Sequence, residues 1–217
     1  ILDEYNAGVK KLFFSKNGLV LTEALMSMFI LAAMIIVLGN LINNGTSTMK
    51  VSRDYLIAED LLTEGLEIVK GVRSSNWLIV PSKKQCWMTL DPATNLQDIN
   101  AIQCPAQQLA FAGNFIPAFE NNHWLLKNRG QAALNLTPQT EENNNIQNLY
   151  RLFILQNGSF QQYLQGINSN NKSKYYRSIK FLDPTDGNVA TFEVKVQWMD
   201  GKKVRTLSAK ERLYNFL

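Results

Sequence analysis

The feature that most constrains this chain is a run of apolar residues, 19–42, that contains a single charged side chain, Glu23. At a helical rise of about 1.5 Å per residue the run extends roughly 36 Å, whereas the hydrocarbon layer of a bilayer is about 30 Å thick. The run is therefore long enough to span a membrane as one helix. A carboxylate in such a span costs up to about 2.5–3.5 kcal/mol, and less near an end, so we expect Glu23 to have a polar partner there.

Basic residues flank the apolar run unequally. Lys10, Lys11 and Lys16 precede it, whereas the first basic residues beyond it are Lys50 and Arg53. Positive charge concentrates on the cytoplasmic side of membrane spans. We therefore expect a single-pass protein of the cytoplasmic membrane whose carboxyl-terminal part lies outside the cytoplasm.

The start of the run resembles the processing site of type IV prepilins and pseudopilins. The resemblance rests on the preceding lysines, on Gly18 directly before the run, and on Thr22 and Glu23, the acid being the fifth residue after the glycine. In that family a prepilin peptidase cuts after the glycine. The resemblance implies that residues 1–18 are a leader peptide and that Leu19 becomes an N-methylated amino terminus.

The same resemblance implies that Thr22 and Glu23 act in assembly. The Glu23 carboxylate would meet the terminal amine of Leu19 in a neighbouring subunit, in a low-dielectric setting where each partner alone is heavily penalised. The alternative is an ordinary membrane anchor with an acid near one end. The prepilin interpretation is favoured because the basic leader, Gly18, the position of the acid and the length of the run coincide.

A second helical pattern follows the apolar run. Residues 43–76 are expected to form the amphipathic half of one long helix, in which apolar residues recur at spacings of four and three. Packing on a sheet is favoured over a coiled coil, because only about three heptads are present and one seam position is glycine. The expected buried stripe consists of Val51, Tyr55, Ala58, Leu62, Gly65, Val69 and Val72, widened by Leu61, Leu66 and Ile68, with Lys50, Arg53, Asp54, Asp60, Glu64 and Lys70 largely off it.

Two stretches bear on the continuity and the end of this helix. Poor helix formers at residues 39–40 and 43–48 indicate either a weak joint or simply the end of the span in water. Ser74, Ser75 and Asn76 are typical of caps and turns, so the helix is expected to stop near Arg73.

The carboxyl-terminal half changes to short apolar runs, which predict strands. The expected strands cover residues 123–126, 132–136, 149–156, 175–182, 190–198 and 204–214. Alternation over residues 192–198 followed by Asp200-Gly201 predicts a hairpin, and Asn157-Gly158 predicts a second one leading into a further strand, SFQQYL. The polar stretches 139–148 and 166–174 are expected to be surface loops and candidates for specificity.

These patterns predict an α+β fold. Its long amino-terminal helix, membrane-spanning in one half and amphipathic in the other, packs on an antiparallel sheet in an extracytoplasmic globular domain, residues 77–217. The order KYYRSIKF, TFEVKVQW and a last strand ending RLYNFL resembles the carboxyl-terminal sheet of pilin-like proteins.

The chain has two cysteines, Cys86 and Cys104. In an exported domain two cysteines at this separation are expected to form a disulfide. The closed loop would stabilise the domain by about 3 kcal/mol in the chain-entropy model.

Metal binding has weak support. The single histidine, His123, has no second histidine or paired cysteine motif near it, so no zinc site is expected. Asp183, Asp186 and Asn188 offer oxygen ligands and form a weak calcium candidate, as in some pseudopilins. A plain turn is favoured there, because the EF-hand pattern with its distal glutamate is absent. No cofactor is expected.

The sequence contains no nucleophile elbow, no phosphate-binding glycine loop and no metal-binding histidine pair, so we do not expect an enzyme. The expected function is that of a structural subunit, major or minor, of a type IV pilus or related filament. The alternatives are a pseudopilin of type II secretion and a membrane-anchored surface binding module that never polymerises.

The expected partners follow from this function. They are the membrane, other pilin subunits and further copies of this chain, the prepilin peptidase and the pilus assembly platform. A host-cell surface or DNA are further candidates for the globular domain. The net charge of +4 and the pI of about 9.0 allow contact with anionic polymers, but the 22 basic and 18 acidic residues are mixed along the chain, which is a weak nucleic-acid signal.

Overall fold

In the residues that it describes, the computed structural model of the chain has a long helix and a seven-stranded sheet. It describes residues 2–79, 86–89, 113–120, 122–130, 133–137, 148–157, 160–165, 171–186 and 189–215, with side chains for all of these except residues 2–19, 79, 157, 160 and 183–186. The chain divides into two compact units, Ile1–Arg53 and Asp54–Leu217, which are described separately. The division lies within the segment predicted as the amphipathic half of the helix, whose residues from Asp54 onward belong with the sheet.

The helix α1 runs from Leu2 to Ile79 without a break. The sequence left open a weak joint at residues 43–48, and the structure shows helix throughout this stretch. The hydroxyls of Thr46 and Thr48 donate to the backbone carbonyls of Asn43 and Asn44, at 3.0 and 2.9 Å. Their hydrogen-bonding needs are thus met within the helix, although such residues otherwise favour caps and turns.

The helix ends at Ile79, so the predicted stop near Arg73 is wrong. Asn76, one of the expected terminating residues, is buried, and its side-chain amide donates to the carbonyls of Trp87 (3.0 Å) and Thr89 (2.9 Å). The Arg73 guanidinium carbon lies 4.3 Å from the centre of the Trp77 ring. These contacts stabilise the last turns of the helix and override the local preference for a cap.

All pairings between the described strands are antiparallel. The strands are β1 (Gly113–Glu120), β2 (His123–Asn128), β3 (Arg151–Asn157), β4 (Phe160–Gln165), β5 (Lys172–Asp186), β6 (Val189–Asp200) and β7 (Lys203–Tyr214). A long amino-terminal helix and a carboxyl-terminal antiparallel sheet confirm the predicted α+β class.

Most predicted strands are present, and both predicted hairpins are confirmed. Asp200 pairs with Lys203 across the turn between β6 and β7, where Gly201 has φ +61°, and Asn157 pairs with Phe160 between β3 and β4. A positive φ is readily adopted by glycine, which explains Gly201 at this turn. The predicted loop 166–174 is wrong at its end, because β5 already begins at Lys172.

Two strand predictions fail. Strand β1 was missed, since its sequence contains Gly113 and Pro117, which are poor strand signals. The strand predicted at residues 132–136 is wrong, because residues 133–137 have no regular structure. Leu134 and Leu136 are nevertheless buried, so the apolar pattern there reports burial rather than strand pairing.

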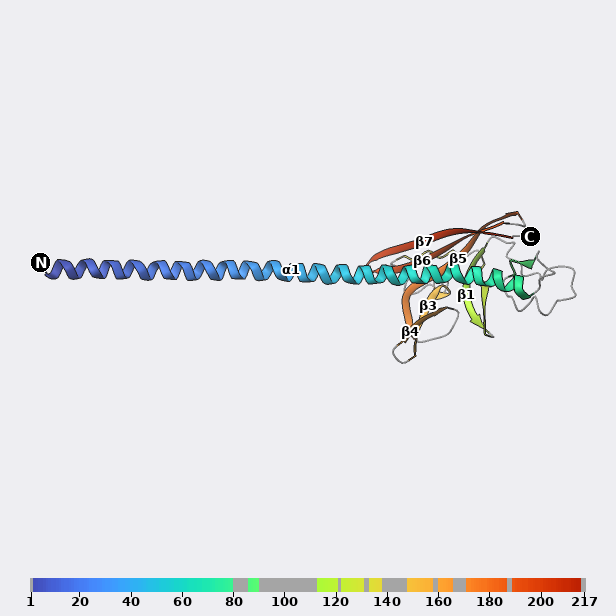
Figure 1. Ribbon diagram of the computed structural model, residues 1–217, viewed down its shortest axis with the longest axis horizontal. Coiled ribbons are helices and arrows are strands. Elements are labelled where there is room, and N and C mark those ends of the chain that lie inside the picture. The colour runs from blue at the N-terminus through green and yellow to red at the C-terminus, as the bar shows by residue number, and fades with distance from the viewer. Residues whose placement is uncertain are drawn as a thin grey trace. The chain divides into compact units, whose positions relative to one another are not determined.

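The sheet is forked at one edge of β5. Near one end, Gly113–Phe115 of β1 pairs with residues 179–181, and further along the same edge β3 pairs with β5 at Arg151 and Phe153. The hairpins β1–β2 and β3–β4 therefore leave the same edge of β5 at successive positions, while β6 and β7 continue the sheet from its other edge. In Figure 1, β6 and β7 lie on one side of α1 and the two hairpins on the other.

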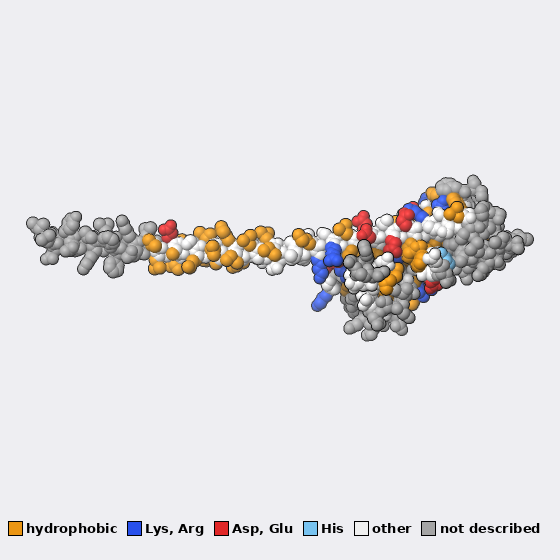
Figure 2. Space-filling model, turned by 60° about the horizontal axis from the view of Figure 1, so that its bottom comes forward, with side chains coloured by type: hydrophobic (Ala, Val, Ile, Leu, Met, Phe, Trp, Pro, Cys, Tyr) orange, Lys and Arg blue, Asp and Glu red, His pale blue; other side chains and the backbone are white. Residues whose placement is uncertain are grey.

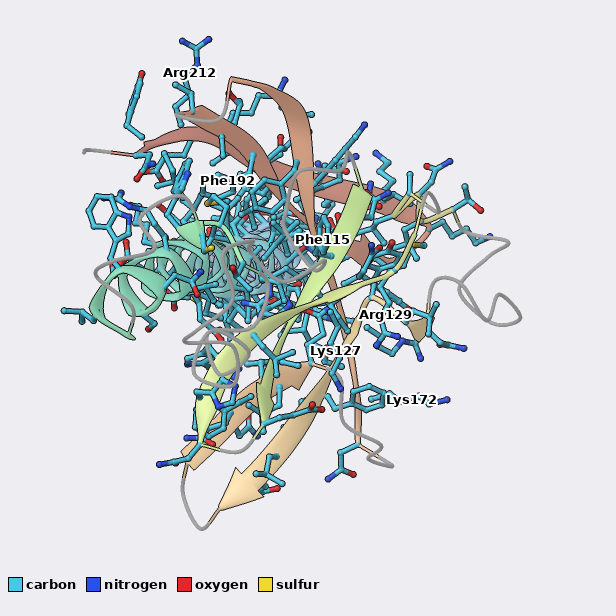
Figure 3. All side chains as sticks on the ribbon, turned by 90° about the vertical axis from the view of Figure 1, so that its right-hand side faces the viewer. Phe115, Lys127, Arg129, Lys172, Phe192 and Arg212 are labelled. Carbon is cyan, nitrogen blue, oxygen red and sulfur yellow. The ribbon has the colours of Figure 1, made fainter. Side chains whose placement is uncertain are left out.

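The helix packs on one face of the sheet, as predicted from the periodicity. A second cluster lies on the opposite face, because neighbouring residues of one strand, such as Phe115 and Ile116, belong to different clusters. Figure 3 shows Phe115 and Phe192 beside the helix, while Lys172 and Arg212 point outward. The helix contributes Ala58, Leu61, Leu62, Ile68, Val69 and Val72 to the main cluster, and the sheet contributes Phe115, Phe181, Phe192, Val194, Val196 and Trp198 among others.

The helix lies close against the sheet at Gly65. A Cβ at this position would lie 2.8 Å from Val194 Cγ1 and 3.3 Å from Arg177 Cδ. Val194 is buried and β-branched, so it has little freedom to move aside. The coiled-coil alternative, in which this face would be exposed in a single chain, is therefore excluded.

Gly65→Ala is expected to destabilise the chain, because the added methyl overpacks this contact by about 1–3 kcal/mol, against a gain in helix propensity of about 1 kcal/mol. Gly71→Ala is the matched control, since nothing lies within 4 Å of a Cβ built there. It should stabilise the chain by up to about 1 kcal/mol. Urea unfolding of both variants, followed by near-UV circular dichroism, makes the comparison, and equal shifts for the two would contradict the packing argument.

Candidate functional site

The apolar surface of α1 within Ile1–Arg53 is the first candidate site. Between Val20 and Ile42 every large hydrophobic side chain is more than half exposed, from 53% for Ile30 to 74% for Phe29. By length and composition this helix is apolar enough to cross a membrane, and none of its most apolar window is buried. A helix that is apolar on all sides is typical of a membrane span or a protein interior, so this surface requires lipid or other protein around it.

The predicted processing and assembly residues lie at the start of this segment. Gly18 and Leu19 are within α1, and their side chains lie outside the described set. Glu23 is exposed on the helix, and it is the only charged residue between Val20 and Met49. Figure 2 shows an acidic side chain at the amino-terminal end of the hydrophobic segment. Pairing of Glu23 with Leu19 of another subunit stays a prediction.

Polar side chains within the segment bond to the helix itself. The Ser27 hydroxyl donates to the Ala24 carbonyl at 2.9 Å, as Thr46 and Thr48 do further along. These bonds occupy hydroxyl groups that would otherwise require water. The carboxylate of Glu23 has no such route, because it has only acceptor atoms when ionised. It is the group in this segment that most requires a partner outside its own helix.

The second candidate is a buried polar network between helix and sheet in the unit Asp54–Leu217. Arg177 of β5 is 1% exposed, and its Nη1 donates to the Leu61 carbonyl at 2.9 Å and lies 3.2 Å from Glu64 Oε2. Its Nε donates to Gln165 Oε1 at 3.3 Å. Gln165 Nε2 donates in turn to the carbonyls of Tyr150 and Arg177, at 2.8 and 2.7 Å. The network thus joins α1, β4 and β5 where the sheet forks.

Burial lowers the pKa of Arg177, and Glu64 acts in the opposite direction by favouring the charged form. The two partners differ in burial, since the Arg177 side chain is 1% exposed and the Glu64 side chain is 36% exposed. Sequence reasoning placed Glu64 off the buried stripe, which agrees with this partial exposure, but it did not identify Arg177. The available signal was an arginine in phase with the inward-facing Tyr175, Ile179 and Phe181 of one strand.

Asp54 was predicted to lie off the buried stripe, and this is wrong, because it is 7% exposed. Its carboxylate forms an ion pair with Lys174, and the hydroxyl of Tyr175 lies 3.3 Å from Asp54 Oδ1. Because its carboxylate has a charge partner and a hydroxyl donor, Asp54 can be buried, although the helical periodicity of the sequence places it off the buried stripe.

Lys70 connects the helix to β7. Its Nζ lies 3.1 Å from Glu211 and 3.3 Å from Glu67, and the hydrogen bond to Glu211 is the main cause of a raised pKa for Lys70. Because the folded pKa exceeds the ordinary value of 10.5, this contribution to stability is present at neutral pH and is lost as the pH rises through the raised pKa. The pair is partly exposed, so its contribution is small.

Cys86 is buried and disulfide-bonded. Cys104, its predicted partner, lies outside the described residues. The segment that carries Cys86 is attached to the helix end, because the Thr89 carbonyl accepts from the Asn76 amide. Within the segment, the backbone N–H and the hydroxyl of Thr89 donate to the Cys86 carbonyl, at 3.3 and 2.9 Å. This segment therefore holds the end of α1 to the domain.

The three residues of the calcium candidate have side chains outside the described set. Asp183 and Asp186 are in β5, with side chains outside the described set, and Asn188 is also outside it. Within the described part of the chain, no group of three or more His, Cys, Asp or Glu side chains is placed to hold a metal ion. The predicted loop 139–148 likewise lies almost wholly outside the described ranges.

Comparison with known proteins adds no relative. No family model, no curated protein and no solved structure matches the chain.

The Arg177 network yields a stability prediction. Arg177→Met should destabilise the chain by about 2–4 kcal/mol, because the Leu61 carbonyl and the Gln165 amide oxygen lose a buried donor. Glu64→Gln should cost about 1 kcal/mol, since an acceptor remains at a partly exposed position. Arg205→Met is the control, because it breaks the partly exposed pair with Asp200, and it should cost at most about 1 kcal/mol. Unfolding in urea ranks the three, and a loss for Arg205→Met as large as that for Arg177→Met would refute the assignment.

Proposed function

We propose that this chain is a structural subunit of a type IV pilus or a related filament, assembled through the apolar half of α1. The observation that carries the proposal is a segment of α1, Val20 to Ile42, that is apolar on all sides and whose one carboxylate, Glu23, is the fifth residue after Gly18. The confirmed α+β layout supports it. In this function the domain from Asp54 onward is displayed outside the cytoplasm for contact with surfaces, and no catalytic role is assigned to it.

The proposed cycle has two stages. The subunit first resides in the cytoplasmic membrane through residues 19–42, where the prepilin peptidase removes residues 1–18 and the assembly platform engages it. The same segment then transfers into a bundle of like helices in the filament, with this chain or other pilin subunits as neighbours. In the bundle, the side chains of other subunits replace lipid around the exposed apolar residues.

Processing separates this proposal from a membrane-anchored binding module. We expect mass spectrometry of the protein purified from its native membrane to show an amino terminus at N-methylated Leu19. An intact segment ahead of Gly18 in the membrane-bound protein would instead support the anchored module. Gly18→Val is the companion variant, and it should leave the segment uncut, because the family's cleavage requires the glycine.

The role of Glu23 yields a second prediction. Glu23→Ala should leave membrane insertion intact or slightly improved, since a charge is removed from an apolar segment. Filament yield should fall steeply, because the amine of Leu19 would enter the filament core without its carboxylate, a loss of about 3–5 kcal/mol at each contact. Glu23→Gln, which keeps an acceptor of the same shape, should show an intermediate or severe defect.

Sheared surface filaments, quantified beside the membrane-bound subunit, measure the effect. Ser27→Ala is the matched control, since Ser27 lies one turn further along and bonds only to its own helix. Its filament yield should match that of the unmodified chain. Normal filament yield from Glu23→Ala would overturn the pairing mechanism.

A further inference from the structure

A groove of about 590 Å³ opens on the unit Asp54–Leu217 where the sheet forks. About two turns of α1 form its floor, the β1–β2 hairpin one wall and β4 the other. Its lining residues are Ile57, Asp60, Leu61 and Glu64 of α1, Phe119 of β1, Trp124 of β2, and Gln161, Gln162, Tyr163 and Leu164 of β4. Figure 2 shows acidic side chains next to a hydrophobic area on this unit.

The wall formed by β4 is the edge of a strand. Side chains of successive strand residues point to opposite faces, so the four consecutive residues 161–164 line one groove only if the strand's edge faces it. Strand β4 is the last strand on this side of the sheet and pairs with β3 alone among the described strands. Such an edge presents backbone donors and acceptors that can pair with an added strand.

The side chains around this edge favour a cation. None of the ten described residues that line the groove is basic. Glu64 already pairs with Arg177, whereas Asp60 is exposed, so Asp60 supplies an available negative charge. Phe119 is 49% exposed, and its ring lies edge-to-face with Trp124 at 5.2 Å between centroids. A carboxylate beside aromatic rings is a suitable environment for an ammonium or guanidinium group.

We propose that this groove binds an extended peptide segment of a partner protein, which adds to the edge of β4 and places a lysine or arginine side chain between Asp60 and the aromatic rings. Backbone pairing supplies affinity and the basic side chain supplies selectivity. The proposal is independent of filament assembly, because a chain that stays in the membrane as a monomer carries the same groove.

Other occupants fit the lining less well. Anionic polymers such as DNA are disfavoured, since the charges in the lining are negative. A neutral oligosaccharide would use the aromatic rings and the glutamine amides but would leave the backbone edge of β4 unused. Phosphocholine would use the aromatic rings and Asp60 but likewise not the edge. Each of these ligands is included in the test as a competing outcome.

The test uses the full-length chain in detergent micelles and isothermal titration calorimetry. The main probe is an acetylated and amidated heptapeptide of sequence Thr-Val-Thr-Lys-Thr-Val-Thr, which we expect to bind with a Kd below about 1 mM. Replacing its lysine by glutamate should weaken binding at least about tenfold. Backbone N-methylation of alternate residues should abolish binding when the methyl groups lie on the peptide edge that pairs with β4. Methyl groups on the opposite edge of the peptide should preserve binding.

Two variants test the groove itself. Asp60→Asn should weaken binding of the lysine peptide about tenfold and leave binding of the glutamate peptide unchanged or stronger. Phe119→Ala should also weaken binding, and its half-exposed side chain makes a folding defect small. Glu59→Gln is the matched control, because Glu59 is exposed on the adjacent helix position but does not line the groove. Its affinity should equal that of the unmodified chain.

The proposal is overturned by any of four results. Three of them concern the peptides: the lysine peptide does not bind, the lysine and glutamate peptides bind equally, or both N-methylated peptides bind with unchanged affinity. The fourth is a loss of affinity in Glu59→Gln as large as that in Asp60→Asn. Tighter binding of phosphocholine or of chitotetraose, a neutral oligosaccharide, than of the peptide also overturns it. None of these results bears on processing at Gly18 or on filament yield, so the proposed function is tested separately.

Discussion

The structure depends on removing the apolar surface of α1 between Val20 and Ile42 from water. Each square ångström of such surface left in water costs roughly 25 cal/mol, and here large apolar side chains point in every direction around the helix. No face of this segment can be assigned to solvent, so a partial covering does not suffice. Only a complete covering, by lipid or by a bundle of other helices, would meet this requirement, and both stages of the proposed function provide one.

The unit from Asp54 onward meets a different constraint, because one helix face must fit a forked sheet closely. Gly65 sets how near the helix lies to Val194. Arg177 of the sheet sets the lengthwise register of the helix on the sheet, because it bonds the Leu61 carbonyl and Glu64. Compared with an apolar pair of the same shape, a buried charge pair adds little net stability, because its desolvation offsets much of its attraction. Removal of Arg177 alone is costly for a different reason, since its buried acceptors are left without a donor. Sliding the helix by one turn would separate Arg177 from both partners and leave it unpaired, so the pair disfavours alternative registers.

The sequence predicted the parts of the fold in which a periodic pattern extends over many residues. The stripe from Ala58 to Val72, strands β5 to β7 and the Asp200-Gly201 turn are examples, and each is confirmed. The failures occur where contacts between distant residues decide. Asn76 continues the helix because of carbonyls at Trp87 and Thr89, Asp54 is buried because Lys174 and Tyr175 reach it, and β1 forms although its glycine and proline weaken the strand pattern.

The two candidate sites differ in the same way. The apolar segment and Glu23 are visible in sequence because a membrane or filament core acts on composition and length, which are local properties. The groove is not visible in the sequence, because it exists only where two hairpins leave one edge of β5 and enclose part of α1. Its ten lining residues come from four elements whose association no periodicity reports. The sequence thus identifies the segment on which the proposed assembly rests, and only the fold brings together the residues of the groove.

The proposed transfer of α1 from membrane to filament would have a physical consequence for Glu23. Lipid tails are as apolar as the side chains of other helices, so moving the segment from one to the other yields little hydrophobic free energy. The driving force must come from close packing and from polar groups that are better satisfied in the bundle than in lipid. Ser27, Thr46 and Thr48 gain nothing there, because their hydroxyls already bond within the helix. Glu23 is the charged group of the segment that lipid leaves unpaired, and this makes it the residue through which the proposed assembly can be favoured over the membrane.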